Sequence, residues 1–107
     1  MSRYLLLICV DPDIEVNSDA NAIEVWLKEV SGARMYGNEL RPPEEGQFVR
    51  VREGRVNVLT GDGPFAETKE FVAGFDVLEC ATIEEAVEIG SRHPAARFGT
   101  VYVRQFL

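Results

Sequence analysis

The hydrophobic pattern at the start of the chain predicts a strand followed by a helix. Residues 4–10 form a continuous apolar run, which is typical of a central strand buried on both faces. After a polar loop, apolar residues recur with the spacing of an amphipathic helix, at Ile23, Trp26, Leu27 and Val30. Ser18 or Asp19 can cap this helix, and Gly32 is expected to end it.

Further along, the pattern predicts five strands and a second helix. The strands are expected over residues 34–40, 47–52, 55–59, 71–80 and 100–106. Glu53-Gly54 suits a two-residue turn, so residues 47–52 and 55–59 should form a hairpin. Thr82 and Glu85 have the spacing of a capping box and mark the start of the second helix, which His93-Pro94 ends. Four residues are expected on its inner face: Ile83, Ala86, Val87 and Gly90.

This order of elements predicts the fold class. A β-α-β-(β-hairpin)-β-α-β chain is an α+β protein, a ferredoxin-like split β-α-β arrangement with an inserted hairpin. Both helices should then cover one face of the sheet. Because the strand over residues 4–10 is apolar on both sides, the other face needs a cover as well. A second copy of the chain is the simplest cover, so we expect a homodimer.

Composition narrows the class of protein. The 107 residues suit one domain over residues 1–107, and 46% hydrophobic with 27% charged residues is typical of a globular chain. A net charge of −7 disfavours nucleic acid or an anionic membrane as the main partner, because phosphate binding needs a positive field. No apolar run approaches the roughly 20 residues of a membrane span, and we expect a cytoplasmic protein.

Cofactor and metal motifs do not emerge from the sequence. Cys9 and Cys80 lie in apolar strands without metal-ligand spacing, and we expect both to be buried free thiols. His93 is the single histidine, which excludes a histidine-rich metal site. Dinucleotide and nucleotide phosphate-loop motifs are also absent. We therefore expect no metal and no cofactor.

The segment from Asp62 to Glu70, with the sequence DGPFAETKE, is the richest in candidate chemistry. Asp-Gly-Pro favours a loop, because Gly63 tolerates positive φ and Pro64 fixes its own. Loops held between strands often contain functional groups. Asp62 is a candidate general base or ligand-orienting carboxylate, or else a loop residue that bonds its own backbone.

The other candidate residues have similar alternatives. Glu67, Lys69 and Glu70 form either a polar site or a solvated loop with weak ion pairs. Phe65 either fills the core or an interface, or stacks on a ligand. His93 is placed at a helix C-terminus, where a cation favours the helix dipole, and is also a candidate acid or base. Arg97 binds either an anionic ligand or a nearby carboxylate.

Six segments can be compared with known families: the nonapeptide over residues 62–70, YLLLI (4–8), GNELRPP (37–43), VRVREGRV (49–56), GF (74–75) and PAARFGTVYVR (94–104). Together they resemble the YCII-related domain family, in its DGPF branch. The resemblance covers nearly the whole chain and implies a dimeric α/β barrel on a ferredoxin-like fold. It also implies an association with sigma-factor-type transcription regulation.

The wider family is associated with a His–Asp pair whose histidine lies near the first helix, and some members act on small aromatic compounds. This chain has no histidine between Asp11 and Gly32. Two hypotheses follow. In the first, a homodimer binds a small polar or aromatic molecule in a pocket near the Asp62–Phe65 loop, with or without enzymatic activity. In the second, the protein is a non-catalytic regulatory module that contacts a regulatory protein through its acidic surface.

Overall fold

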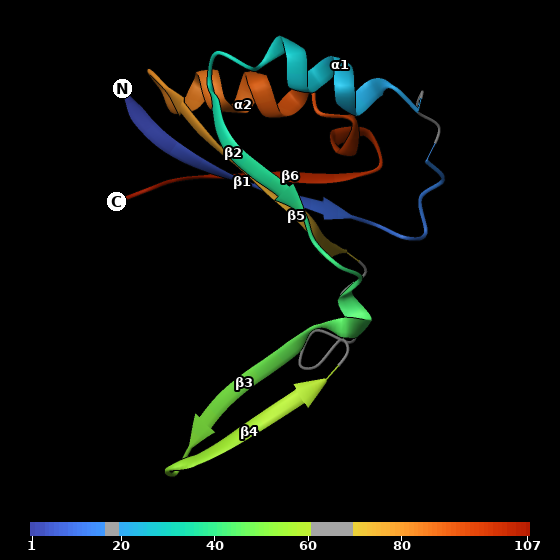
Figure 1. The fold of residues 1–107 in the computed structure, drawn as a ribbon, viewed down its shortest axis with the longest axis vertical. Coiled ribbons are helices and arrows are strands. Elements are labelled where there is room, and N and C mark those ends of the chain that lie inside the picture. The colour runs from blue at the N-terminus through green and yellow to red at the C-terminus, as the bar shows by residue number, and fades with distance from the viewer. Residues whose placement is uncertain (17–19, 61–69) are drawn as a thin grey trace.

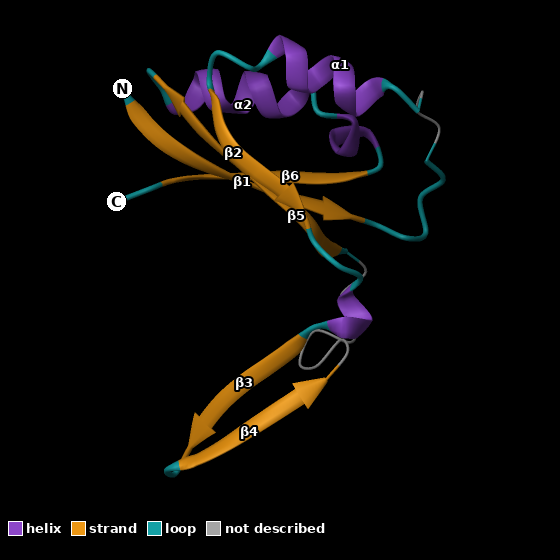
Figure 2. Cartoon of the chain, viewed as in Figure 1, coloured by secondary structure: helices purple, strands orange, loops and turns teal. Residues whose placement is uncertain are grey.

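The computed structural model describes residues 1–16, 20–60 and 70–107. Within them the chain forms an α+β fold of six strands, two α-helices and two short 3-10 helices (Figures 1 and 2). In chain order these are β1 (Ser2–Val10), α1 (Ala22–Glu29), β2 (Arg34–Glu39), η1 (Pro43–Glu45), β3 (Gln47–Arg52), β4 (Arg55–Thr60), β5 (Phe71–Cys80), α2 (Ile83–Ser91), η3 (Pro94–Arg97) and β6 (Gly99–Gln105).

The main sheet has the strand order β2-β5-β1-β6, and each neighbouring pair is antiparallel. Strands β1 and β5 form its centre, where Leu6 lies opposite Asp76 on one side and Val103 on the other. Both helices cover the same face of this sheet (Figure 1). The arrangement is compatible with the ferredoxin-like fold predicted from the order of elements.

The core lies between the two helices and the sheet. Strand residues that point toward the helices are buried, while their neighbours on the opposite face are only half-buried, as the two-residue period of a strand requires. The buried apolar residues are Tyr4, Leu6, Ile8, Leu78 and Cys80 from the sheet, with Trp26, Val30, Ala86, Ile89 and Ala95 from the helical layer.

The predicted inner face of α2 is wrong in part. Ala86 and Gly90 are buried as expected, but Ile83 and Val87 are 41% and 51% exposed. Ile89 is buried instead. The small residues Ala86 and Gly90 bring α2 close to the sheet, and a Cβ on Gly90 would already touch the side chains of Val101 and Leu6. The helix is therefore turned so that Ala86, Ile89 and Gly90 form its buried side.

The helix ends differ from the predictions in detail. Helix α1 begins after Asn21 and ends at Glu29, before Gly32, with Val30 as the C-cap residue. Ser18 and Asp19 lie outside the described residues. In α2 the Thr82 hydroxyl accepts a hydrogen bond from the Glu85 amide at 3.2 Å, as predicted.

The returning half of the predicted capping box is shifted by one residue. The Glu85 carboxylate accepts from the amide of Ala81 at 3.0 Å, whereas the sequence spacing predicted the amide of Thr82. Thr82 has extended backbone angles, and the residue before it presents the amide that the carboxylate reaches.

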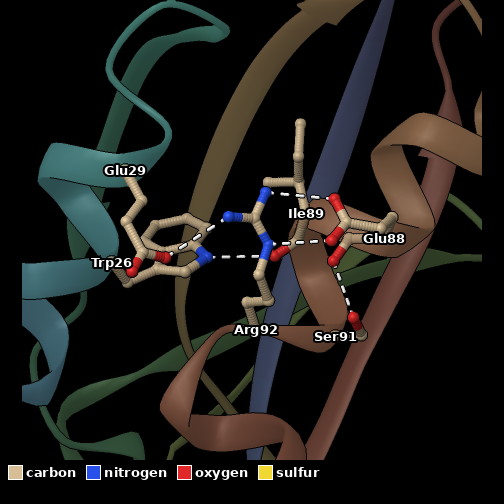
Figure 3. Close-up of polar contacts among 6 residues, drawn as sticks. All are labelled: Trp26, Glu29, Glu88, Ile89, Ser91 and Arg92. Atoms are coloured by element: carbon tan, nitrogen blue, oxygen red, sulfur yellow. Dashed lines mark hydrogen bonds and ion pairs between the residues drawn. The ribbon is translucent and has the colours of Figure 1, made fainter.

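Polar contacts fasten α1 to α2 (Figure 3). The indole Nε1 of Trp26 donates to the carbonyl oxygen of Ile89 at 3.0 Å. Arg92, which follows α2, donates to Glu29 at 3.3 Å and to Glu88 at 3.0 Å, so one guanidinium joins the two helices. The buried indole bond matters more than these exposed ion pairs, because solvent screens charges at the surface.

Strands β3 and β4 form a separate two-stranded sheet that projects from the end of β2 (Figure 1). We call residues 47–60 the arm. Its turn has positive φ at both central residues, 53° at Glu53 and 74° at Gly54, which is the backbone of a type I′ hairpin. Apart from the half-buried Phe48, every arm residue is exposed. Neither helix in the described part of the chain is long and apolar enough to cross a membrane.

Candidate functional site

A cavity of about 560 Å³ lies between the helical layer and the main sheet. Its walls come from β1, α1, β2, β5 and the segment around η3. Most of the lining is apolar and includes Ile8, Leu27 and Phe98. Its charged side chains are Arg34, Glu39 and Asp76, and Trp26 and His93 line it as well.

An ion pair forms the polar wall of this cavity. Asp76 occupies the middle of β5 on the helix side, between the buried Gly74 and Leu78, and is itself only 6% exposed. The Nε of Arg34, at the start of β2, lies 2.7 Å from its Oδ1. Burial raises the pKa of Asp76, and the hydrogen bond and charge of Arg34 oppose that rise. The positive charge of Arg34 therefore offsets part of the cost of burying the ionised Asp76 carboxylate.

Gly37 gives this ion pair its space. It lies opposite Asp76 in the register of β2 and β5. A Cβ at this position would overlap the Asp76 carboxylate and would approach the Phe75 carbonyl oxygen to 2.6 Å and Nη2 of Arg34 to 2.7 Å. A glycine is therefore required beside the pair for steric reasons.

His93 forms the second polar group of the cavity. Its Nδ1 accepts a hydrogen bond from the amide of Ala95 at 2.9 Å, so the side chain caps η3. The ring meets that of Trp26 edge to face, with centroids 4.6 Å apart and planes at 69°. Burial lowers the pKa of His93 to about 4, which leaves the ring neutral at pH 7. Because Nδ1 accepts, the proton of the neutral ring is on Nε2.

This geometry corrects one prediction. The sequence placed His93 at a helix C-terminus as a cation that favours the helix dipole. The structure instead makes it a buried, neutral N-cap of the next short helix, because α2 ends at Ser91 and η3 begins at Pro94. A neutral imidazole with one nitrogen bonded to the backbone offers its other nitrogen as a donor.

Of the other candidate residues, the structure describes Arg97 and Glu70. Asp62, Phe65, Glu67 and Lys69 lie outside the described residues. Arg97 is exposed on η3 and is not part of the cavity lining. Glu70, just before β5, accepts hydrogen bonds from the Thr100 hydroxyl at 2.8 and 3.0 Å, which ties it to β6.

Sequence reasoning missed Arg34 and Asp76, and it identified Trp26 only as part of the apolar stripe of the first helix. One signal was present for Asp76. It stands among apolar residues in the strand 71–80, at an even-numbered position shared with Leu78 and Cys80. A carboxylate on the inward face of a central strand needs a partner, which marks the position as unusual.

The fold and this cavity define a small α+β protein with a ligand-sized space between its helices and its sheet. The model of the YCII-related domain matches residues 28–107. The chain therefore belongs to the YCII-related domain family, as its sequence predicted.

A curated relative shows local similarity only. It is an uncharacterised protein of Rhizobium meliloti (strain 1021), 42% identical over 38 residues. The matched segment covers 36% of this chain and 31% of the relative. The chain thus spans less than a third of the relative that it matches.

Proposed function

We propose that this YCII-related protein, as a DGPF-type member, binds a small polar or aromatic molecule in the cavity between α1, η3 and the sheet. The observation that carries the proposal is His93, a buried neutral imidazole beside Trp26 on the wall of that cavity. Ligand sites are typically concave and apolar, with a few convergent polar groups that fix orientation. The cavity has this composition.

The lining favours a particular kind of ligand. A flat apolar or aromatic ring suits a space bounded by Ile8, Leu27 and Phe98. A carbonyl or phenol oxygen on that ring suits the Nε2–H of neutral His93. The buried Asp76 disfavours an anionic group beside it, although Arg34 neutralises much of its charge. We therefore propose a small neutral or weakly polar aromatic compound.

The segment over residues 61–69 belongs to the same proposal. Residues 61–69 join β4 to β5 in the chain, and residues 73–76 of β5 line the cavity. Asp62, Phe65, Glu67 and Lys69 are therefore candidates to complete the site, and any catalysis would use Asp62.

We also propose that a second copy covers the face of the main sheet that the helices leave open. That face presents apolar and aromatic side chains, with Tyr36 57% and Tyr102 50% exposed beside Leu5, Leu7, Phe75 and Val77.

The test is a binding screen by thermal shift, followed by titration calorimetry, with phenol, benzaldehyde and indole as probes at pH 7.5. A compound that binds the native state raises its melting temperature. His93→Asn keeps a side chain able to cap η3 and should weaken binding about tenfold or more, the value of one good hydrogen bond. Lys28→Gln, an exposed position of α1 outside the cavity lining, is the matched control.

The outcomes separate the parts of the proposal. Equal binding by the wild type and His93→Asn would place the ligand elsewhere. Loss of binding in Asp62→Asn with an unchanged melting temperature would assign Asp62 to the site. Absence of binding by every probe to a folded wild type would contradict the proposed ligand class.

A further inference from the structure

The arm has one face made of four valines. In the register of β3 and β4, Val49 lies opposite Val58 and Val51 opposite Val56, so all four side chains share one side. Their exposures are 66%, 51%, 56% and 66% in that order. The other side holds the three arginines of the arm with Phe48, Asn57 and Leu59.

Such an arm is unstable on its own. A two-stranded hairpin is at best marginally stable in water, and it needs a third strand or a packed surface to persist. The turn at Glu53 and Gly54 fixes the register but buries nothing. β-branched residues on one face of a ribbon are typical of a surface that packs against another protein surface.

The net charge of the arm indicates which kind of partner the valine face packs against. The arm contains Arg50, Arg52 and Arg55 against Glu53, a net charge of +2 in a chain of net charge −7. The rest of the chain therefore carries −9, which repels nucleic acid and anionic membranes from the neighbourhood of the arm. The same −9 on another copy attracts the arm, so a second copy of this chain is the complementary partner.

The position of the arm leads to the same partner. The helices lie on one side of the main sheet, and the arm extends on the other side (Figure 1). The uncovered sheet face, with Tyr36, Phe75 and Tyr102, is also on that side. A second copy seated on this face would lie beside the arm.

We propose that the arm is a clasp that each chain lays on a second copy, with its valine face against the partner. This inference rests on the homodimer in the proposed function and adds a second, separate contact to it. The arm is then ordered by assembly. Its arginines lie on the opposite face, so they do not touch the surface under the valines, and their charge adds a long-range attraction to the acidic partner.

The test compares two substitutions on neighbouring residues of β4 by analytical ultracentrifugation. Val58→Asp places a charge on the valine face, and Asn57→Asp places the same charge on the opposite face. We expect Val58→Asp to weaken dimerisation about tenfold or more, because an unpaired charge in an apolar contact is costly. Asn57→Asp should change the dimerisation constant much less.

Hydrogen exchange on the wild type provides a measurement that needs no variant. Arm amides should exchange more slowly above the dimerisation constant than below it. A dimer that tolerates Val58→Asp and shows no concentration-dependent protection of the arm would overturn the clasp while leaving the sheet-face dimer in place. A wild-type chain that stays monomeric at micromolar concentration would overturn both. If the arm belongs to a different protein, its amides would exchange at one rate at every concentration of the pure chain.

Discussion

The Nε of Arg34 lies 2.7 Å from Oδ1 of Asp76, in the wall of the cavity that lies beside the core, between the helical layer and the sheet. Arg34 begins β2 and Asp76 lies in the middle of β5, so this pair ties an edge strand to a central one. It also gives the cavity a polar wall that is already neutralised. Asp76 is 6% exposed, so its ionised form depends on the arginine.

The first prediction concerns this dependence. Arg34→Met should destabilise the fold by about 3 kcal/mol at pH 7, because it leaves a buried carboxylate without its cation. The pKa of Asp76 is raised in the fold, so protonation of this carboxyl stabilises the folded state. That stabilisation is present at low pH and is lost as the pH rises through the folded-state pKa. At pH 4 the cost of Arg34→Met relative to wild type should therefore be smaller. Urea unfolding at both pH values measures the difference.

Asp76→Asn provides the control for this prediction. In that background there is no carboxylate to compensate, so adding Arg34→Met should cost similar amounts at pH 7 and pH 4. An equal cost of Arg34→Met at the two pH values in the wild-type background would show that the arginine acts through packing and not through charge.

The second prediction concerns His93. Its pKa falls from 6.5 in the unfolded chain to about 4 in the fold, so the neutral ring stabilises the folded state. That contribution is fully present above pH 6.5 and is lost as the pH falls toward 4. The difference corresponds to roughly 3 kcal/mol. NMR titration of the His93 ring should give a midpoint well below 6, and urea unfolding should show stability falling between pH 6.5 and 4.

His93→Asn isolates the histidine from other titrating groups. Asparagine can accept from the Ala95 amide at the start of η3 but does not titrate. The variant should lose less stability than the wild type between pH 6.5 and 4. The same acid dependence in both proteins would assign the effect to carboxylates.

The sequence predicted much of this fold because the strands have clear patterns. Residues 47–52 and 71–80 were predicted as strands from their alternation and apolar content, and the structure has β3 and β5 over those ranges. Helix α1 followed from the spacing of Trp26 and Val30, both of which are buried. These are local signals, which depend on the period of the element alone.

The cavity could not be predicted in the same way. Arg34 and Asp76 are 42 positions apart, and they meet only because β2 pairs with β5 across a register shift between Arg34 and Tyr36. His93 changed role because a short 3-10 helix follows α2, and four residues give no periodic signal. Sites that depend on sheet order and on short irregular segments are determined by tertiary structure.

The third prediction concerns the glycine beside the ion pair. Gly37→Ala should destabilise the fold by about 1–3 kcal/mol, because its methyl group would occupy space taken by the Asp76 carboxylate and the Phe75 carbonyl. Gly32→Ala is a matched control, since a Cβ there would meet no heavy atom within 4 Å and its φ is not positive. Thermal unfolding of both variants measures the contrast. Equal melting temperatures would mean that β2 moves away from β5 at little cost.

The last prediction concerns the two cysteines, which are both free, with Cys80 buried as expected and Cys9 only half-buried. Cys9 lies opposite Val72 in the pairing of β1 with β5, whereas Cys80 lies opposite Ser2. They are therefore near opposite ends of the same strand pair, roughly 20 Å apart at about 3.3 Å per residue. A disulfide needs Cα atoms within about 7 Å. Burial also raises the pKa of both thiols, so little thiolate forms at neutral pH.

Mild oxidation of the folded protein should accordingly give no link between Cys9 and Cys80 within one chain. Peptide mapping by mass spectrometry under non-reducing conditions checks this, with a sample oxidised in urea as the positive control for a detectable link. A Cys9–Cys80 peptide from the folded sample would contradict the antiparallel register of β1 and β5. Because that register also places Asp76 opposite Leu6 in the core, such a link would remove the basis for the cavity as well.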